Sequence, residues 1–293
     1  MVAINRNTTR RWNWFDGLIT AFMTIAVIAF LYPFWHTLVL SFSTPAFATS
    51  LGLKFIPPEV TFDAYKVVFQ TNIIYIGYGN TLLRTVAGTA LTIVVTYCAA
   101  YALSRRSLPF RSTLTFLIVL TMFFSGGLIP MFLVMKSYGL VGTKLALILP
   151  MLTSAWNILI ARNFIASIGP ELEEAALVDG AHPLKIVFLV MFPVSMPIIA
   201  VLTIWTAVAH WNAWFDALIY TTSEKDIVLQ LVLRRLLIDT QTESTILQST
   251  VAETTSDTIK AATIIVSILP IICVYPFLQK HFAKGIMVGS VKG

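Results

Sequence analysis

Six long apolar runs divide the chain, and no Asp, Glu, Lys or Arg lies inside any of them. A helix needs about 20 consecutive apolar residues to cross the hydrocarbon core of a bilayer. The pattern therefore predicts an all-α membrane protein. Its six transmembrane helices are expected near Gly17 to Leu40, Thr85 to Leu103, Leu114 to Met135, Leu145 to Ile160, Ile186 to Ala209 and Ala261 to Leu278.

The first run has some features of a cleavable signal peptide. Arg6, Arg10 and Arg11 precede it, and the small-residue pattern "AFA" follows at 46–48. The run is, however, about twice as long as a signal core, which normally has roughly 7 to 15 apolar residues. We therefore expect a retained transmembrane helix.

The composition excludes an ordinary soluble domain. Of 293 residues, 57% are hydrophobic and 12% are charged, and the mean hydropathy is +0.82. Cys98 and Cys273 each lie within an apolar run, and their spacing fits neither a disulfide framework nor a metal site.

The net charge of +6 comes from basic residues that flank the predicted spans, so it does not indicate a nucleic-acid partner. Basic residues cluster at the N-terminus, after the second run and in the C-terminal tail, which lie on one side if there are six spans. The positive-inside rule then places both termini in the cytoplasm and the loops at 41–79 and 210–260 outside. The basic residues of the three clusters are Arg6, Arg10, Arg11, Arg105, Arg106, Arg111, Lys280, Lys284 and Lys292.

Both outer loops contain a helical pattern. In the first loop, Phe62, Tyr65, Val68 and Phe69 recur at helical spacing after a Pro-Pro pair, which predicts a short interfacial helix. In the last loop, "DIVLQLVLRRLL" predicts an amphipathic helix.

The segment "PELEEAALVDGAHPLK" at 170–185 concentrates carboxylates between two apolar runs. Pro170 suits a helix start, and acidic residues in the first turn favour the positive end of the helix dipole. Gly180 can end the helix, and Pro183 can begin the next one. A solvated loop helix is the plain alternative, whereas acid-base catalysis is disfavoured because no pocket is indicated.

The same segment resembles the signature of ATP-binding-cassette (ABC) importer permeases, in which Glu-Ala-Ala is followed by Gly and then by an aliphatic residue and Leu-Pro. Phe192 replaces the usual Leu, and Val190 replaces the usual Ile. Three further stretches resemble the carbohydrate-uptake branch, and "FFSGGLIPMFLVMKSYGLVGT" resembles its lipoprotein-linked oligosaccharide and polysaccharide subgroup. The matching stretches are "FIPPEVTFDAYKVVF", "WNAWFDALIY" and "FLQKHFAKGIMVGSVKG", and the signature residues are Glu174, Ala175, Ala176, Gly180, Val190, Phe192 and Pro193.

The resemblance implies a type I permease subunit of a bacterial inner-membrane importer. It implies a cytoplasmic coupling helix between the fourth and fifth spans that docks on a separate ATPase dimer. ATP and Mg would then bind to that ATPase, in agreement with the absence of a phosphate-binding Gly-x-x-x-x-Gly-Lys-Ser/Thr loop here. The residues expected to couple are Glu171, Glu173, Glu174, Ala175, Ala176, Asp179, Gly180, Ala181 and His182.

Other partners also follow from the resemblance. We expect a homologous second permease, an extracytoplasmic solute-binding protein and an oligosaccharide or polysaccharide solute, for which alginate is one candidate. The tail "GIMVGSVKG" would reach the ATPase interface, although a lipid-bound basic tail is the alternative. The implied division is an N-terminal part at 1–76, the transmembrane domain at 77–281 and a cytoplasmic tail at 282–293.

A solute pathway is expected to use polar groups and aromatic rings near the spans. The aromatic residues after the fifth span are also typical of an interfacial belt, and a lone histidine is often structural. The candidates are Ser125, Trp156, Asn157, Trp205, His210, Trp211, Asn212 and Asp216.

The sequence disfavours two other function classes. An ion-gradient-driven secondary transporter would need ionisable residues inside spans and inverted repeats, and the runs contain neither. A membrane-embedded enzyme would need clustered acids or histidines, whereas the four histidines are widely spaced.

Overall fold

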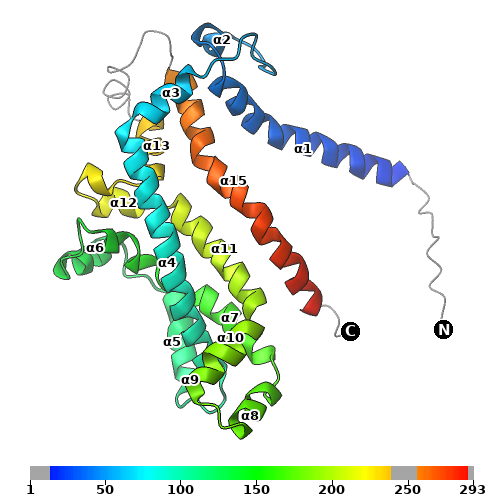
Figure 1. Cartoon of the computed structure of the whole chain (residues 1–293), viewed down its shortest axis with the longest axis vertical. Helices are drawn as coiled ribbons and strands as arrows, with labels where there is room; N and C mark the ends of the chain where they lie inside the picture. The colour runs from blue at the N-terminus through cyan, green and yellow to red at the C-terminus, as the bar shows by residue number, and fades with distance from the viewer. Residues whose placement is uncertain (1–13, 239–255, 290–293) are drawn as a thin grey trace. The chain divides into compact units, whose positions relative to one another are not determined.

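The computed structural model describes residues 14–238 and 256–289, and in the second range it describes the side chains of residues 257–273 (Figure 1). Every described element is a helix, which confirms the all-α prediction for this part of the chain. The described residues form two compact units. Among the described residues, the first unit comprises 14–68 and 256–265, and the second comprises 69–238 and 266–289.

The first unit combines one long apolar helix with part of the segment predicted as the first outer loop. The Trp35 indole donates a 2.7 Å hydrogen bond to the Phe55 carbonyl. The hydroxyls of Ser41 and Tyr65 lie 2.8 Å apart, and burial raises the pKa of Tyr65. The helix predicted around Tyr65 is confirmed. The elements are α1 (Trp14–Ser41), α2 (Pro45–Thr49) and α3 (Asp63–Gln70), whose last two residues belong to the second unit.

Helix α4 (Asn72–Ser104) is the central element of the second unit and packs along α11 (Met196–Asn212) and α7 (Ala155–Ser167) (Figure 1). Its buried face carries small and hydroxyl residues, which let helices approach closely within a membrane. At Gly88 the approach is extreme, because a Cβ atom there would lie 2.6 Å from the His210 ring.

Three predicted spans are bent pairs of helical segments rather than single helices. The third is bent by 115°, the fourth by 51° and the fifth by 79°. The third comprises α5 (Arg111–Phe123) and α6 (Leu128–Ser137). The fourth comprises η1 (Lys144–Leu147), η2 (Leu149–Met151) and α7, and the fifth comprises α9 (Pro183–Lys185), the π-helical η3 (Ile186–Met191), α10 (Phe192–Val194) and α11.

Glycine and proline explain the breaks in the third and fifth spans. Gly127, between α5 and α6, has a φ of +86°, which glycine adopts without a steric penalty. In the fifth span, Pro193 and Pro197 lack amide protons, and the chain bends between them at Ser195. The apolar pattern indicated these three spans but not the breaks within them.

The segment predicted as the last outer loop folds against the start of α4. The amphipathic helix predicted there is confirmed as α13 (Leu229–Ile238), whose first amide donates a 2.9 Å hydrogen bond to the Thr81 hydroxyl. The Asn80 side chain donates to the Ile227 carbonyl at 2.9 Å. Two shorter elements precede α13, namely α12 (Phe215–Tyr220) and η4 (Glu224–Asp226).

The number of spans is only partly supported. Helices α1 and α4 are each long and apolar enough to cross a membrane, and the three bent pairs raise the number to as many as five among the described residues. The sixth predicted span lies within α15 (Ser256–Gly289), where side chains beyond residue 273 fall outside the description. Six spans, cytoplasmic termini and the domain boundaries at 76 and 281 stay predictions.

Candidate functional site

The segment singled out in the sequence forms a short helix, α8 (Glu171–Val178), at the end of the second unit where α9 begins (Figure 1). Pro170 caps it, and three glutamates occupy its first turn, where they favour the positive end of the helix dipole. The helix has eight residues, and its start lies within one residue of the predicted start at Pro170.

A left-handed glycine ends α8. Gly180 has a φ of +74°, its amide donates to the Leu177 carbonyl at 3.0 Å, and the Ala181 amide donates to the Ala176 carbonyl at 2.9 Å. These two bonds form the Schellman motif. The His182 ring nitrogen Nδ1 then accepts a 3.3 Å bond from the Leu184 amide and caps α9. The turn therefore fixes the direction in which the chain leaves α8.

Glu173 attaches α8 to the end of α4. Its carboxylate accepts a 2.8 Å hydrogen bond from the Tyr101 hydroxyl and forms an ion pair with the Arg105 guanidinium. That guanidinium also lies over the Tyr101 ring, 4.3 Å from its centre. The Glu173 and Arg105 side chains are only 13% and 25% exposed, so solvent screens the pair incompletely.

The residues expected to couple to an ATPase are divided between two faces of the α8 segment. Ala176 and Ala181 pack on the buried cluster around Ile186, and Glu173 faces α4. Of the two neighbouring alanines in this set, Ala176 therefore faces the protein interior and only Ala175 is exposed. The other exposed members are Glu171, Glu174, Asp179, Gly180 and His182.

Sequence reasoning did not include the aliphatic residues on the outward surface of α8 and α9 among the site residues. Leu177 is 57% exposed, Val178 88% and Leu184 62%. Exposed aliphatic side chains beside carboxylates form a mixed patch, which is typical of a protein interface. We call this set, together with Leu172, Glu171 and Glu174, the α8 face.

The candidate pathway residues do not gather in one cavity of this chain. Ser125, Trp156, Trp205 and Asn212 are exposed, and Asn157 and Asp216 are half-buried. His210 and Trp211 are buried.

The two buried candidates make contacts within the protein. The Trp211 indole donates to the Ser267 carbonyl at 3.2 Å, and the His210 ring packs against Gly88. These contacts favour a structural role for both.

Asp216 forms an ion pair with Arg84, a residue that sequence reasoning missed. The predicted span started at Thr85, but α4 starts at Asn72 and includes Arg84, which is 1% exposed. Its guanidinium also donates to the carbonyls of Leu147 at 2.9 Å and Ala213 at 3.1 Å. An ionisable residue therefore lies within a helix that is long and apolar enough to cross a membrane, and it joins α4, η1 and the segment at 213–216.

The chain is similar to known proteins over most of its length. Residues 93–288 match the family described as binding-protein-dependent transport system inner membrane component. The polygalacturonan/rhamnogalacturonan transport system permease protein YtcP of Bacillus subtilis (strain 168) is 41% identical over 95% of this chain and 98% of its own length. Protein LplC of the same organism is 40% identical over 90% of both chains.

A solved structure is also similar. It is described as a bacterial ABC transporter involved in the import of the acidic polysaccharide alginate. The superposition has a TM-score of 0.87 at 31% identity and covers 94% of this chain and 99% of the other.

Proposed function

The chain belongs to the family of binding-protein-dependent transport system inner membrane components, and we propose that it is a membrane-spanning permease subunit of an ATP-driven oligosaccharide importer in a bacterial inner membrane. It would form half of the translocation pathway and have no ATPase site of its own. The α8 face is the observation that carries the proposal, since it lies within the matched residues 93–288 and has the properties of a docking surface.

The α8 face would dock in a groove of a cytoplasmic ATPase. Leu177, Val178 and Leu184 would lose exposed apolar surface, which favours association. Glu171 and Glu174 at the edge would pair with basic residues of the partner and set the orientation of docking. Ala175 leaves room for the close approach.

Movement of the ATPase would then be transmitted by two connections. The Glu173 contacts with Tyr101 and Arg105 connect α8 to α4. The turn at Gly180 leads through α9 into the segment that bends by 79° before α11. An ATP-dependent closure of the ATPase would thus shift the equilibrium between two arrangements of these helices.

A complete importer would need further chains. The exposed Ser125, Trp156 and Trp205 fit a pathway shared with a homologous second permease. A dimeric ATPase would bind ATP and Mg, and an extracytoplasmic solute-binding protein would deliver the solute to the outer loops. The C-terminal tail at 285–293, whose side chains lie outside the described residues, would reach the ATPase interface.

The solute is proposed to be an acidic oligosaccharide. The similar permease YtcP is named for polygalacturonan and rhamnogalacturonan, and the similar structure imports alginate. Galacturonan and alginate are both uronic-acid polymers, so they share a ring carboxylate at each uronate unit. Alginate itself is one candidate within this class.

The test is reconstitution of the chain in proteoliposomes with a candidate second permease, ATPase and solute-binding protein. We expect ATP-dependent uptake, and ATP hydrolysis stimulated by galacturonate and alginate oligomers more than by neutral oligomers of equal length. Stimulation by neutral oligomers alone would overturn the acidic specificity. Uptake driven by an ion gradient without ATP would support the secondary-transporter alternative instead.

A further inference from the structure

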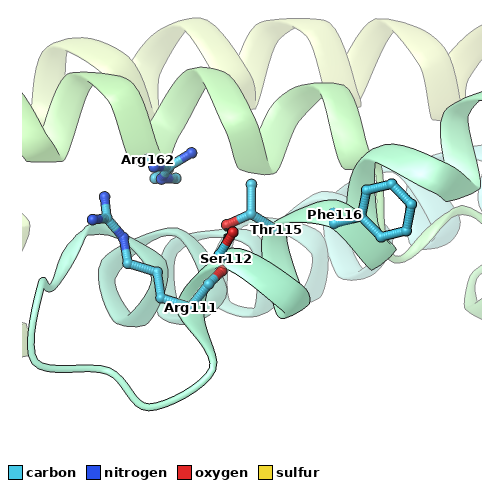
Figure 2. A pocket seen from close by; sticks show the side chains of 5 residues that line it. All are labelled: Arg111, Ser112, Thr115, Phe116 and Arg162. Atoms are coloured by element: carbon cyan, nitrogen blue, oxygen red, sulfur yellow. Dashed lines mark hydrogen bonds between the residues drawn. The ribbon is translucent and has the colours of Figure 1, made fainter.

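A pocket of about 560 Å³ lies at the start of α5, against α7, and it is not part of the α8 face (Figure 2). Four of its lining residues come from the first turns of α5, and Arg162 comes from α7. Figure 2 shows the Arg111 guanidinium near Arg162, with Ser112 and Thr115 next to them and Phe116 at the far end of the row.

The two arginines converge on one backbone atom. Nε of Arg111 donates to the Leu103 carbonyl at 2.8 Å, and Nε of Arg162 donates to the same oxygen at 3.2 Å. These bonds hold both guanidinium groups at one place and leave their Nη atoms available. Within the described residues neither arginine forms an ion pair with a carboxylate. Two neighbouring cations without an acidic partner favour an anion.

The start of α5 adds donors to the same pocket. Phe110 occupies the N-cap with a φ of +55° and offers no side-chain acceptor to the free amides of the first turn. The Ser112 hydroxyl is exposed, whereas the Thr115 hydroxyl donates its only hydrogen to the Arg111 carbonyl at 2.7 Å. Together with the arginines, the free amides and the Ser112 hydroxyl fit the oxygens of a phosphate group.

The other end of the pocket is apolar and opens onto the surface of the helix. Phe116 is 62% exposed, and Leu117 and Phe123 on the same helix are 49% and 78% exposed. Because this surface continues directly from the arginines, the pocket suits an amphiphile better than a soluble anion. We propose that the pocket, lined by Arg111, Ser112, Thr115, Phe116 and Arg162, binds the phosphate group of an anionic phospholipid, with its acyl chains along α5.

The surrounding charge agrees with a lipid in the inner leaflet. Arg105 and Arg106 precede α5 in the same basic loop, which the positive-inside rule assigns to the cytoplasm. Anionic lipids attract basic segments there, and basic pockets between transmembrane helices bind their head groups. The inference does not depend on the identity of the transported solute.

A carboxylate in the pocket provides the first test. Ser112→Asp places a negative charge beside the arginines, and Thr113→Asp places one in the same turn without lining the pocket. Both changes favour the helix dipole, so both variants should fold. The full-length chain in neutral detergent is titrated with dioctanoyl phosphatidylglycerol, and bound lipid is counted by native mass spectrometry. We expect Ser112→Asp to weaken binding by about tenfold and Thr113→Asp by less than about twofold.

Charge removal provides the second test. Arg162→Gln should also weaken phosphatidylglycerol binding by about tenfold, while Arg106→Gln, which removes a charge from the exposed part of the loop, should have little effect. Equal binding of dioctanoyl phosphatidylcholine would overturn the proposal, because only the apolar surface would be recognised. Inorganic phosphate bound as tightly, with the same dependence on Arg162, would overturn the lipid in favour of a soluble anion. Identical behaviour of Ser112→Asp and Thr113→Asp would overturn the site.

Discussion

The guanidinium of Arg84 and the carboxylate of Asp216 form an ion pair between residues 132 positions apart in the chain. Arg84 is 1% exposed and the Asp216 side chain 16%, so the pair is largely shielded from water. Since Arg84 also donates to the carbonyls of Leu147 and Ala213, the pair fixes η1 and the segment at 213–216 against α4.

Removal of one partner of this pair should destabilise the protein strongly. Arg84→Gln leaves a shielded carboxylate and two carbonyls without their donor, and it should lower the free energy of unfolding by about 3 to 5 kcal/mol. Asp216→Asn should cost less, about 1 to 3 kcal/mol, because Arg84 keeps its carbonyl acceptors. Thermal unfolding in detergent measures both.

The double variant Arg84→Gln/Asp216→Asn isolates the interaction between the two residues. A coupling energy of about 0.5 to 3 kcal/mol is expected if the pair acts as a unit. Strictly additive losses would contradict the proposed role of Asp216 as the partner of Arg84. That result would return Asp216 to the set of solute-pathway candidates.

The apolar pattern predicts helices well but cannot predict where a span breaks or which distant residues pair. It located α1 and α4, and the local chemistry of Pro170 and Gly180 predicted both ends of α8. It missed Arg84 because this residue directly precedes an apolar run and its partner is far along the chain. No spacing rule indicates such a contact.

The α8 face shows the same division between local and tertiary information. Ala175 and Ala176 are consecutive in the sequence, and only packing on the buried cluster decides that Ala176 faces inward. Likewise, Glu173 is one of three similar glutamates in sequence, and its role is set by Tyr101 and Arg105. The exposed aliphatic residues of the face carry no sequence signal, since apolar residues are expected almost everywhere in this chain.

Gly180 should be required for coupling because of its backbone conformation. An L-residue at φ of +74° is strained by about 1 to 2 kcal/mol, so Gly180→Ala should distort the turn between α8 and α9. We expect solute-stimulated ATP hydrolysis of the reconstituted importer to fall several-fold, with a larger loss for Gly180→Asp.

Gly139 provides a matched control for that strain. It follows α6 and has a φ of +66°, and, as at Gly180, a Cβ atom added there would meet no other atom within 4 Å. Gly139→Ala should therefore cost similar stability and retain coupling. Equal coupling in both variants would remove the support for α8 as the coupling helix.

Glu173 should transmit movement, whereas Glu174 should only tune docking. Glu173→Gln keeps an acceptor for the Tyr101 hydroxyl but loses the charge that faces Arg105. We expect normal co-purification with the ATPase and a several-fold loss of solute stimulation. Glu174→Gln, which changes an exposed carboxylate on the same helix, should weaken ATPase binding in low salt and leave stimulation intact. The opposite pattern would show that Glu173 is not the connection to α4.

The contact between Gly88 and His210 should exclude any larger side chain at position 88, where α4 crosses α11. A Cβ atom at Gly88 would lie 2.6 Å from the His210 ring, so Gly88→Ala forces the two helices apart and should cost about 1 to 3 kcal/mol. Gly79→Ala, on an exposed part of the same helix with open space around it, should instead be neutral or stabilising by up to about 1 kcal/mol.

Combining Gly88→Ala with His210→Ala separates a steric effect from a general loss of helix packing. It removes the ring that the new methyl group meets, so it should cost less stability in the Gly88→Ala background than in the natural chain. Thermal unfolding in detergent of the two single variants and the double variant gives the comparison. If His210→Ala is equally costly in both backgrounds, the two residues do not press on one another, and the close crossing of α4 and α11 must have another cause.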